Sequence, residues 1–156
     1  MTAAAGPVSR TPPLPLMRHV VNPLVRTVLR SPAGRWCGPL LVLEMTGRRT
    51  GRRRRVPVVG HVCAGRLYAI TDAGWANNFA GSAPVVVVRR GRRLRGSGHL
   101  LTDAAATAAV LREAVATDGA RGLGLVLPSD RATTDEELCA LRRVVLLNGP
   151  GLGPLG

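Results

Sequence analysis

Six arginines on one short connection are the residues of this chain best suited to bind an anion. The segment 40–57 predicts an apolar strand, a turn with Gly47 and Gly51, an arginine block and the start of a second strand. Both glycines can adopt a positive φ. A planar guanidinium binds two oxygens of a phosphate or carboxylate at once. The alternatives to an oxyanion pocket are a solvated basic turn or a nucleic-acid patch, built from Arg48, Arg49, Arg52, Arg53, Arg54 and Arg55.

A second candidate segment runs from Asp72 to Phe79. It contains Trp75, one of two tryptophans, and the only phenylalanine of a chain in which aromatic residues make up 3%. These side chains suit either a plug at the end of a small barrel or a wall against a flat heterocycle. Composition leaves both interpretations open.

The remaining polar residues predict no catalytic group of their own. Arginines 89–95 flank a hairpin turn and are interpreted as solvated charges that protect a strand edge. No Ser-His-Asp or Cys-His pair and no close pair of carboxylates is present, so any chemistry needs a cofactor. The three histidines and three cysteines lack the spacing of metal ligands, and we expect no metal. Cys37, Cys63 and Cys139 are expected to be reduced, mostly buried thiols of a cytoplasmic protein.

Charge and length limit the class of protein. The chain has 156 residues, enough for one domain, and a net charge of +13 in which every basic residue is arginine. That sign predicts an anionic partner: a phosphorylated ligand, a nucleic acid or an anionic membrane. The aromatic stripe of single-strand binders is missing. No apolar run reaches membrane-spanning length, and no signal peptide is recognisable.

The elements that must position these residues follow from the hydrophobic pattern. Residues 1–15 are expected to be a disordered tail, 16–148 a single domain and 149–156 a loose tail. Residues 16–30 predict an amphipathic helix, which we expect to pack on the domain; peripheral contact with a membrane surface is the alternative.

The pattern from residue 40 onward predicts six strands and two helices. Strands are expected over 40–45, 55–63, 67–71, 85–89, 92–101 and 144–147, with hairpin turns at Ala64–Gly65 and Arg90–Gly91. Helices are expected over 104–117 and over 134–141, where Thr134 and Glu137 have the spacing of a capping box. Residues 119–130 are expected to be irregular, and Gly96 and Gly98 suggest a bulge or bend. This order predicts a mainly β (α+β) fold: a split antiparallel β-barrel of about six strands with flanking helices. Alternating βαβ units, GxGxxG and Walker loops are absent, which excludes a doubly wound nucleotide fold.

Two motifs resemble those of the deazaflavin-dependent nitroreductase family. These are actinobacterial split β-barrel proteins related to the flavin-binding pyridoxamine phosphate oxidase barrels. The first motif is TGR-[KR]-[ST]-G-x-x-R-x-x-P, present as Thr46 to Pro57. The second is W-x-x-N-[LF], present as Trp75, Asn78 and Phe79. The resemblance covers roughly residues 24–147, and the two motifs together are fairly specific.

The resemblance implies a cofactor, coenzyme F-420, which is an 8-hydroxy-5-deazaflavin with a phosphate and an oligoglutamate tail. The basic turn would hold the phosphate and tail, two strand segments would line the ring with their backbone groups, and the segment after them would close over it. The residues so implied are Arg48, Arg49, Thr50 and Arg54; Val56, Pro57, Val58 and Val59; Ile70, Thr71, Asp72 and Ala73; and Gly74, Trp75, Asn77 and Asn78.

The resemblance also implies hydride transfer from the reduced deazaflavin to a small electron-poor acceptor, such as an enone, a quinone or a nitro compound. Catalytic residues stay unknown, because the tyrosine that some members use has no counterpart here; Tyr68, the sole tyrosine, falls within a strand. The alternatives are FMN as the cofactor, or a non-catalytic flavin- or ligand-binding protein on the same barrel. Nucleic acid is not expected as the partner, and a homodimer is plausible.

Overall fold

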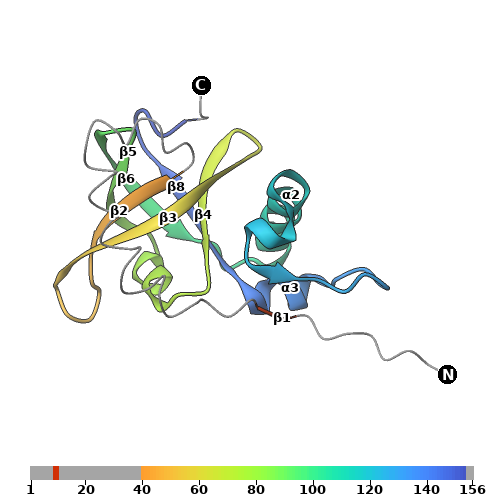
Figure 1. Cartoon of the computed structure of the whole chain (residues 1–156). Helices are drawn as coiled ribbons and strands as arrows, with labels where there is room; N and C mark the ends of the chain where they lie inside the picture. The colour runs from red at the N-terminus through yellow and green to blue at the C-terminus, as the bar shows by residue number, and fades with distance from the viewer. Residues whose placement is uncertain (1–8, 11–39, 154–156) are drawn as a thin grey trace, which may run out of the picture.

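The structure, a computed structural model, describes residues 9–10 and 40–153 (Figure 1). In the described part, a closed antiparallel barrel of six strands lies beside a layer formed by α2 (Ala104–Gly122) and α3 (Asp135–Leu141). The predicted split-barrel fold class with flanking helices is therefore confirmed. The predicted helix over 16–30 and most of the predicted tail over 1–15 lie outside the described residues.

The barrel strands follow the order β2-β3-β4-β8-β6-β5, and every pair of neighbours is antiparallel. Two-residue turns join β3 to β4 at Ala64–Gly65 and β5 to β6 at Arg90–Gly91. All four residues have a positive φ, which matches the right-handed twist of the strands. The strands are β2 (Leu40–Thr46), β3 (Arg53–Cys63), β4 (Arg66–Thr71), β5 (Ala83–Arg89), β6 (Arg92–Leu100) and β8 (Arg143–Asn148).

Alternation of side chains along the strands builds the core inside the barrel. In β2, Leu41, Leu43 and Met45 join the inner cluster, while Val42 between them packs outside the barrel. A short 3₁₀ helix, η3 (Gly74–Phe79), closes one end, and its Phe79 is 0% exposed in the same cluster. Burial of each such side chain stabilises the fold by about 1.5–3 kcal/mol. Phe79 therefore plugs the barrel, as one of the two interpretations of its segment predicts.

A second core lies between the barrel and the helical layer. Tyr68 from β4 and Val144 from β8 pack there against Leu111 of α2 and Leu138 of α3. Cys63 belongs to the same cluster, and burial raises the pKa of its thiol to about 11. The thiol is therefore protonated at neutral pH and serves as a small apolar side chain. None of the helices within residues 40–153 combines the length and the hydropathy that a membrane crossing requires.

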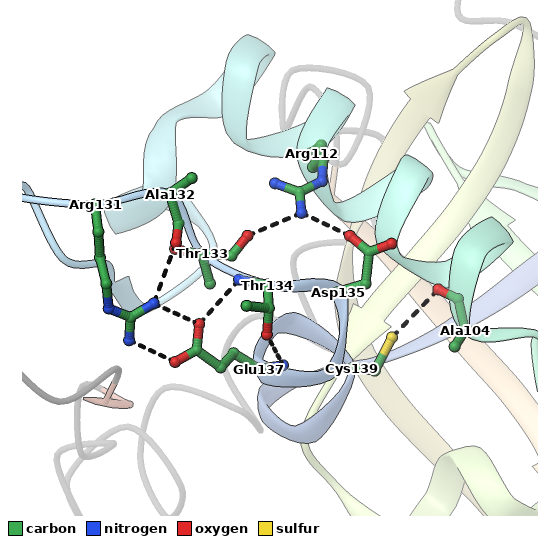
Figure 2. Close-up of polar contacts among 9 residues, drawn as sticks. All are labelled: Ala104, Arg112, Arg131, Ala132, Thr133, Thr134, Asp135, Glu137 and Cys139. Atoms are coloured by element: carbon green, nitrogen blue, oxygen red, sulfur yellow. Dashed lines mark hydrogen bonds and ion pairs between the residues drawn. The ribbon is translucent and has the colours of Figure 1, made fainter.

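Caps define where both helices begin. Asp103 accepts a hydrogen bond from the Ala106 N–H at the start of α2. At α3 the Thr134 hydroxyl accepts from the Glu137 N–H, and the Glu137 carboxylate accepts from the Thr134 N–H (Figure 2). This reciprocal capping box was expected from the Thr-x-x-Glu spacing, and it is confirmed.

Three expectations need correction. The helix expected over 104–117 continues to Gly122, with a kink at Gly119 (φ 77°, ψ 155°). The span 119–130, expected to be irregular, also contains strand β7 (Leu125–Val126), which pairs with β1 (Ser9–Arg10). A two-residue strand carries too little pattern to be found from sequence.

The third correction concerns the glycines of β6. The strand pairs one to one with β5 and β8, so neither glycine forms a bulge. A Cβ on Gly98 would lie 2.4 Å from Phe79 Cδ1, and one on Gly96 would lie 2.2 Å from the Asn148 oxygen. The glycines instead make room for the aromatic plug and for the neighbouring backbone. Of the predicted loose tail, Leu152 packs into the barrel core.

Candidate cofactor site

The two sequence motifs meet in one cavity. The β2–β3 hairpin and η3 are about thirty residues apart along the chain, yet both lie at the same end of the barrel (Figure 1). Between them is a cavity of about 630 Å³, which we call the turn pocket. It is lined by Gly47, Arg48, Arg49, Thr50, Arg54, Gly74, Trp75, Asn77 and Asn78.

Backbone hydrogen bonds hold the basic turn in shape. The Gly47 N–H donates to the Arg52 oxygen at 2.8 Å, and the Gly51 N–H donates to the Gly47 oxygen at 2.9 Å. Gly51 has φ +64°, which favours glycine. A Cβ on Gly47 would lie 2.7 Å from the Thr50 hydroxyl oxygen, so a side chain there would displace that of Thr50. The turn therefore presents its arginines from a closed and ordered loop.

Asn78 joins the two sides of the pocket. Its Oδ1 accepts a hydrogen bond from the Arg48 N–H at 2.7 Å, across thirty residues of chain. Its Nδ2 donates to the Trp75 oxygen at 2.9 Å. Both ends of the amide are thus engaged within the protein. The side chain that the sequence assigned to ligand contact sets the position of the basic turn relative to η3.

Trp75 stands at the apolar side of the pocket. It is half-buried, and its ring meets the Phe79 ring edge to face, with centroids 6.2 Å apart and an interplanar angle of 89°. Such a contact holds an aromatic ring in one orientation. The buried Phe79 ring therefore supports Trp75 in the lining of the pocket, and a role of Trp75 as a wall against a flat heterocycle stays a prediction.

The electrostatics of the pocket are those of an anion site. Among the described residues, no carboxylate forms an ion pair with Arg48, Arg49 or Arg54. On β3 the side chains alternate, and of its first three arginines only Arg54 lines the turn pocket, as the alternation predicts. Three guanidinium groups without a carboxylate partner favour a ligand that carries phosphate or carboxylate groups.

The structure places half of the predicted site residues outside the lining of this cavity. Val56 and Val58 pack against the barrel core, and Ile70 packs against the second core. The Thr71 hydroxyl accepts from the Ala73 N–H at 3.0 Å, and Asp72 lies 3.9 Å from Arg142. Pro57 and Val59 belong to β3 and also lie apart from the lining. A role for these residues toward a cofactor stays a prediction.

Sequence reasoning placed Gly47 in the turn without counting it as a site residue, and it missed Glu44. The Glu44 carboxylate forms ion pairs with Arg55 (3.1 Å) and Arg93 (2.6 Å), from two different strands. One signal was available, because Glu44 is the only carboxylate among the first 71 residues. No cluster of His, Cys, Asp or Glu suited to a metal occurs among the described residues.

Comparison with known proteins agrees with an oxidoreductase on this barrel. The model of the F420H(2)-dependent quinone reductase family matches residues 16–120. The match spans more than half of the chain, so the protein belongs to this family. It is an oxidoreductase that depends on coenzyme F-420. A search of curated proteins found no match.

The chain is also similar to solved structures. An F420-H2 dependent reductase (FDR-A) is 15% identical with a TM-score of 0.44, over 71% of this chain and 95% of that chain. The FAD and haem binding protein from Mycobacterium smegmatis is 16% identical with a TM-score of 0.42, over 76% of this chain and 69% of that chain. A protein described as a domain-swapped dimer is 15% identical with a TM-score of 0.48, over 71% and 81%.

Proposed function

We propose that the turn pocket holds coenzyme F-420 and that the protein passes a hydride from its reduced form to an electron-poor organic acceptor, with a quinone as the first candidate. The observation that carries the proposal is the convergence of two distant motifs on one cavity. Family membership supports the same cofactor and names quinones. Enones and nitro compounds share the electron-poor character of quinones and are further candidates.

The residues of the pocket fit such a cofactor. Three arginines at one side match a phosphate and a chain of carboxylates, and Trp75 at the other side matches a flat ring. The volume of about 630 Å³ lies within the usual range for small-molecule sites. When bound and reduced, the deazaflavin supplies the hydride.

The protein's part in the reaction is to position the reactants and exclude water. The arginines of the turn neutralise the anionic groups, and the Asn78 bridge keeps the turn at one distance from η3. Because the Phe79 plug is fully buried, the Trp75 wall rests on a rigid base. Fixing donor and acceptor in one geometry lowers the entropic part of the barrier. Among the described residues, the arginines are the only titratable side chains that line the pocket, and we assign the proton that completes the reduction to solvent.

A titration followed by a turnover assay tests the proposal. We expect the purified protein to bind F-420 saturably in a fluorescence titration, and to bind FMN more weakly. Mixing the reduced cofactor with a soluble quinone should then restore the absorbance of the oxidised deazaflavin at a rate proportional to protein concentration. Binding without turnover on any acceptor would favour the non-catalytic alternative, and preference for FMN would remove the cofactor assignment.

Three finer expectations accompany the proposal. We propose a cytoplasmic location, a homodimer, and packing of residues 16–30 on the domain, with peripheral membrane contact as the alternative for this segment. Their support is the arginine-bearing amphipathic pattern of 16–30 and the frequency of pairing among related barrels. Flotation with anionic vesicles tests the membrane contact, and light scattering of the purified chain tests the dimer.

A further inference from the structure

A second cavity opens on the barrel wall, apart from the turn pocket. It has a volume of about 400 Å³, and we call it the arginine cleft. Strands β3 and β6 supply five arginines to its lining, and β2 supplies the one carboxylate. These residues are Arg53, Arg54, Arg55, Arg93, Arg95 and Glu44.

The cleft lies where two strands of the barrel separate. Strands β2 and β5 pair from Val42–Val88 only as far as Glu44–Val86. Beyond that point β2 continues along β3, and β5 continues along β6, without pairing to each other. Met45 and Val85, each at most 5% exposed, face this opening and give it an apolar floor. The cleft thus has an apolar base and basic walls.

The charges of the cleft are not balanced within the described part of the chain. Glu44, whose side chain is 12% exposed, bridges Arg55 on β3 and Arg93 on β6. No described residue forms an ion pair with Arg53, Arg54 or Arg95. Glu44 therefore ties the two walls together and leaves three guanidinium groups for a ligand. Their mutual repulsion falls when an anion lies between them.

We propose that the arginine cleft is a second anion-binding site, which takes a small organic molecule with at least two carboxylate or phosphate groups. Arg53, Arg54 and Arg95 together offer more N–H donors than one oxyanion accepts, which favours a ligand with at least two such groups. The volume fits a small molecule and not a folded partner. A second copy of the same face would bring arginines against arginines, which disfavours a symmetric dimer at this surface.

A polyanionic ligand of the arginine cleft has two candidate sources. The ligand is either a separate metabolite or the acidic tail of a cofactor that occupies the turn pocket. Arg54 lines both cavities, so the two sites are neighbours. Binding of the cofactor's tail in the cleft rests on the proposed function, whereas binding of a separate polyanion does not.

Calorimetric titration with citrate and with inorganic triphosphate, at constant ionic strength, tests the site directly. We expect saturation at one equivalent, and at least tenfold weaker binding in the double variant Arg53→Gln/Arg95→Gln. The matched control is Arg66→Gln/Arg92→Gln, which removes the same charge from exposed positions outside both cavities and should stay within twofold of the wild type. Equal weakening in both double variants, or no saturable binding of either probe, would overturn the proposal.

A second measurement uses only the wild-type protein, so its result does not depend on whether the double variant folds. In the wild-type protein, citrate should shift the amide NMR signals of Gly96 and Val85, which line the cleft, before those of Thr50 and Asn77, which line the turn pocket. Shifts confined to the turn pocket would contradict a second site. Displacement of citrate by a short DNA duplex, equal in both double variants, would show diffuse attraction and overturn the assignment as well.

Titrations with F-420 and with a deazaflavin that lacks the glutamate tail distinguish the two sources. Tail-dependent affinity that disappears in Arg53→Gln/Arg95→Gln identifies the cofactor's own tail as the ligand. Unchanged affinity for both deazaflavins, with citrate binding lost, identifies a separate molecule. If neither deazaflavin binds, the proposed function fails, and the citrate titration still decides on the cleft.

Discussion

The two halves of the described chain use arginine in opposite ways. Residues 40–101, which form most of the barrel, contain twelve arginines and two carboxylates. Residues 102–153, which form the helical layer and the last strand, contain five arginines and seven carboxylates. The high positive charge of the chain is therefore concentrated on the barrel.

Of the five arginines in residues 102–153, three are bound within the protein. Arg112 donates to the Asp135 carboxylate at 2.6 Å and to the Thr133 oxygen at 2.9 Å (Figure 2). Arg131 binds both oxygens of Glu137, and the buried Arg142 donates to the oxygens of Leu123 and Gly124. On the barrel, the arginines of the turn pocket have no such partners among the described residues. From this difference we expect stability to depend on the first group and ligand binding on the second.

Loss of Arg142 should show the largest effect on stability. Its side chain is 8% exposed, and its removal leaves the Leu123 and Gly124 oxygens buried without donors. We expect Arg142→Ala to lower the free energy of unfolding by about 3 kcal/mol, measured by urea denaturation. The neighbouring Arg143→Ala is the control, because Arg143 is exposed and should change stability by less than about 0.5 kcal/mol. Similar losses of unfolding free energy in Arg142→Ala and Arg143→Ala would contradict the stabilising role of arginines that are bound within the protein.

Arg49→Ala and Arg54→Ala should show the opposite profile. We expect each to weaken F-420 binding by about 1 to 3 kcal/mol, as a lost charge-assisted contact, with little change in the unfolding midpoint. Arg52→Ala is the matched control, because Arg52 belongs to the same turn but lines neither cavity. If both variants bind the cofactor as well as the wild type, the assignment of the turn pocket is wrong.

Loss of the Asn78 side chain should affect both stability and cofactor binding. Asn78→Ala removes the bond to the Arg48 N–H and should lower the free energy of unfolding by about 1 kcal/mol while also weakening F-420 binding. Asn77→Ala, at an exposed position in the same pocket, should leave stability unchanged. Thermal unfolding and fluorescence titration of both variants give the comparison. A stable Asn78→Ala protein with full affinity would show that the bridge does not position the turn.

The smallest expected effect concerns acid stability of the helical layer. Hydrogen bonds from Arg131 and from the Thr134 backbone lower the pKa of Glu137 from 4.5 to about 2. A lowered folded pKa means that the contribution is present above the unfolded value and is lost as pH falls through the folded value. The wild type should therefore keep α3 between pH 4.5 and 2, whereas Arg131→Gln should begin to lose helical circular dichroism at higher pH. Acid transitions of the wild type and Arg131→Gln at the same pH would contradict this account.

Local patterns were enough for most of the elements. The turns at Ala64–Gly65 and Arg90–Gly91, the strands between them and the capping box of α3 follow from interactions within a few residues, and all were predicted. The kink at Gly119 and the pairing of β1 with β7 were not, because both depend on what packs against those residues. At Gly96 and Gly98 the expected bulge is absent, and a sequence does not show which ring or carbonyl approaches a missing Cβ.

The candidate site likewise combines features that residue types predict with features that only the tertiary structure determines. The arginine turn, the Trp75 segment and their affinity for an anion and a flat ring can be deduced from residue types, because guanidinium and indole chemistry does not depend on the fold. Only the tertiary structure brings the two segments to one cavity, engages both ends of the Asn78 amide and packs the side chains of Val56 and Val58 against the core. Only the separation of β2 from β5 creates the arginine cleft. Strand pairing, which joins residues far apart in the chain, decides which of the many arginines share a ligand.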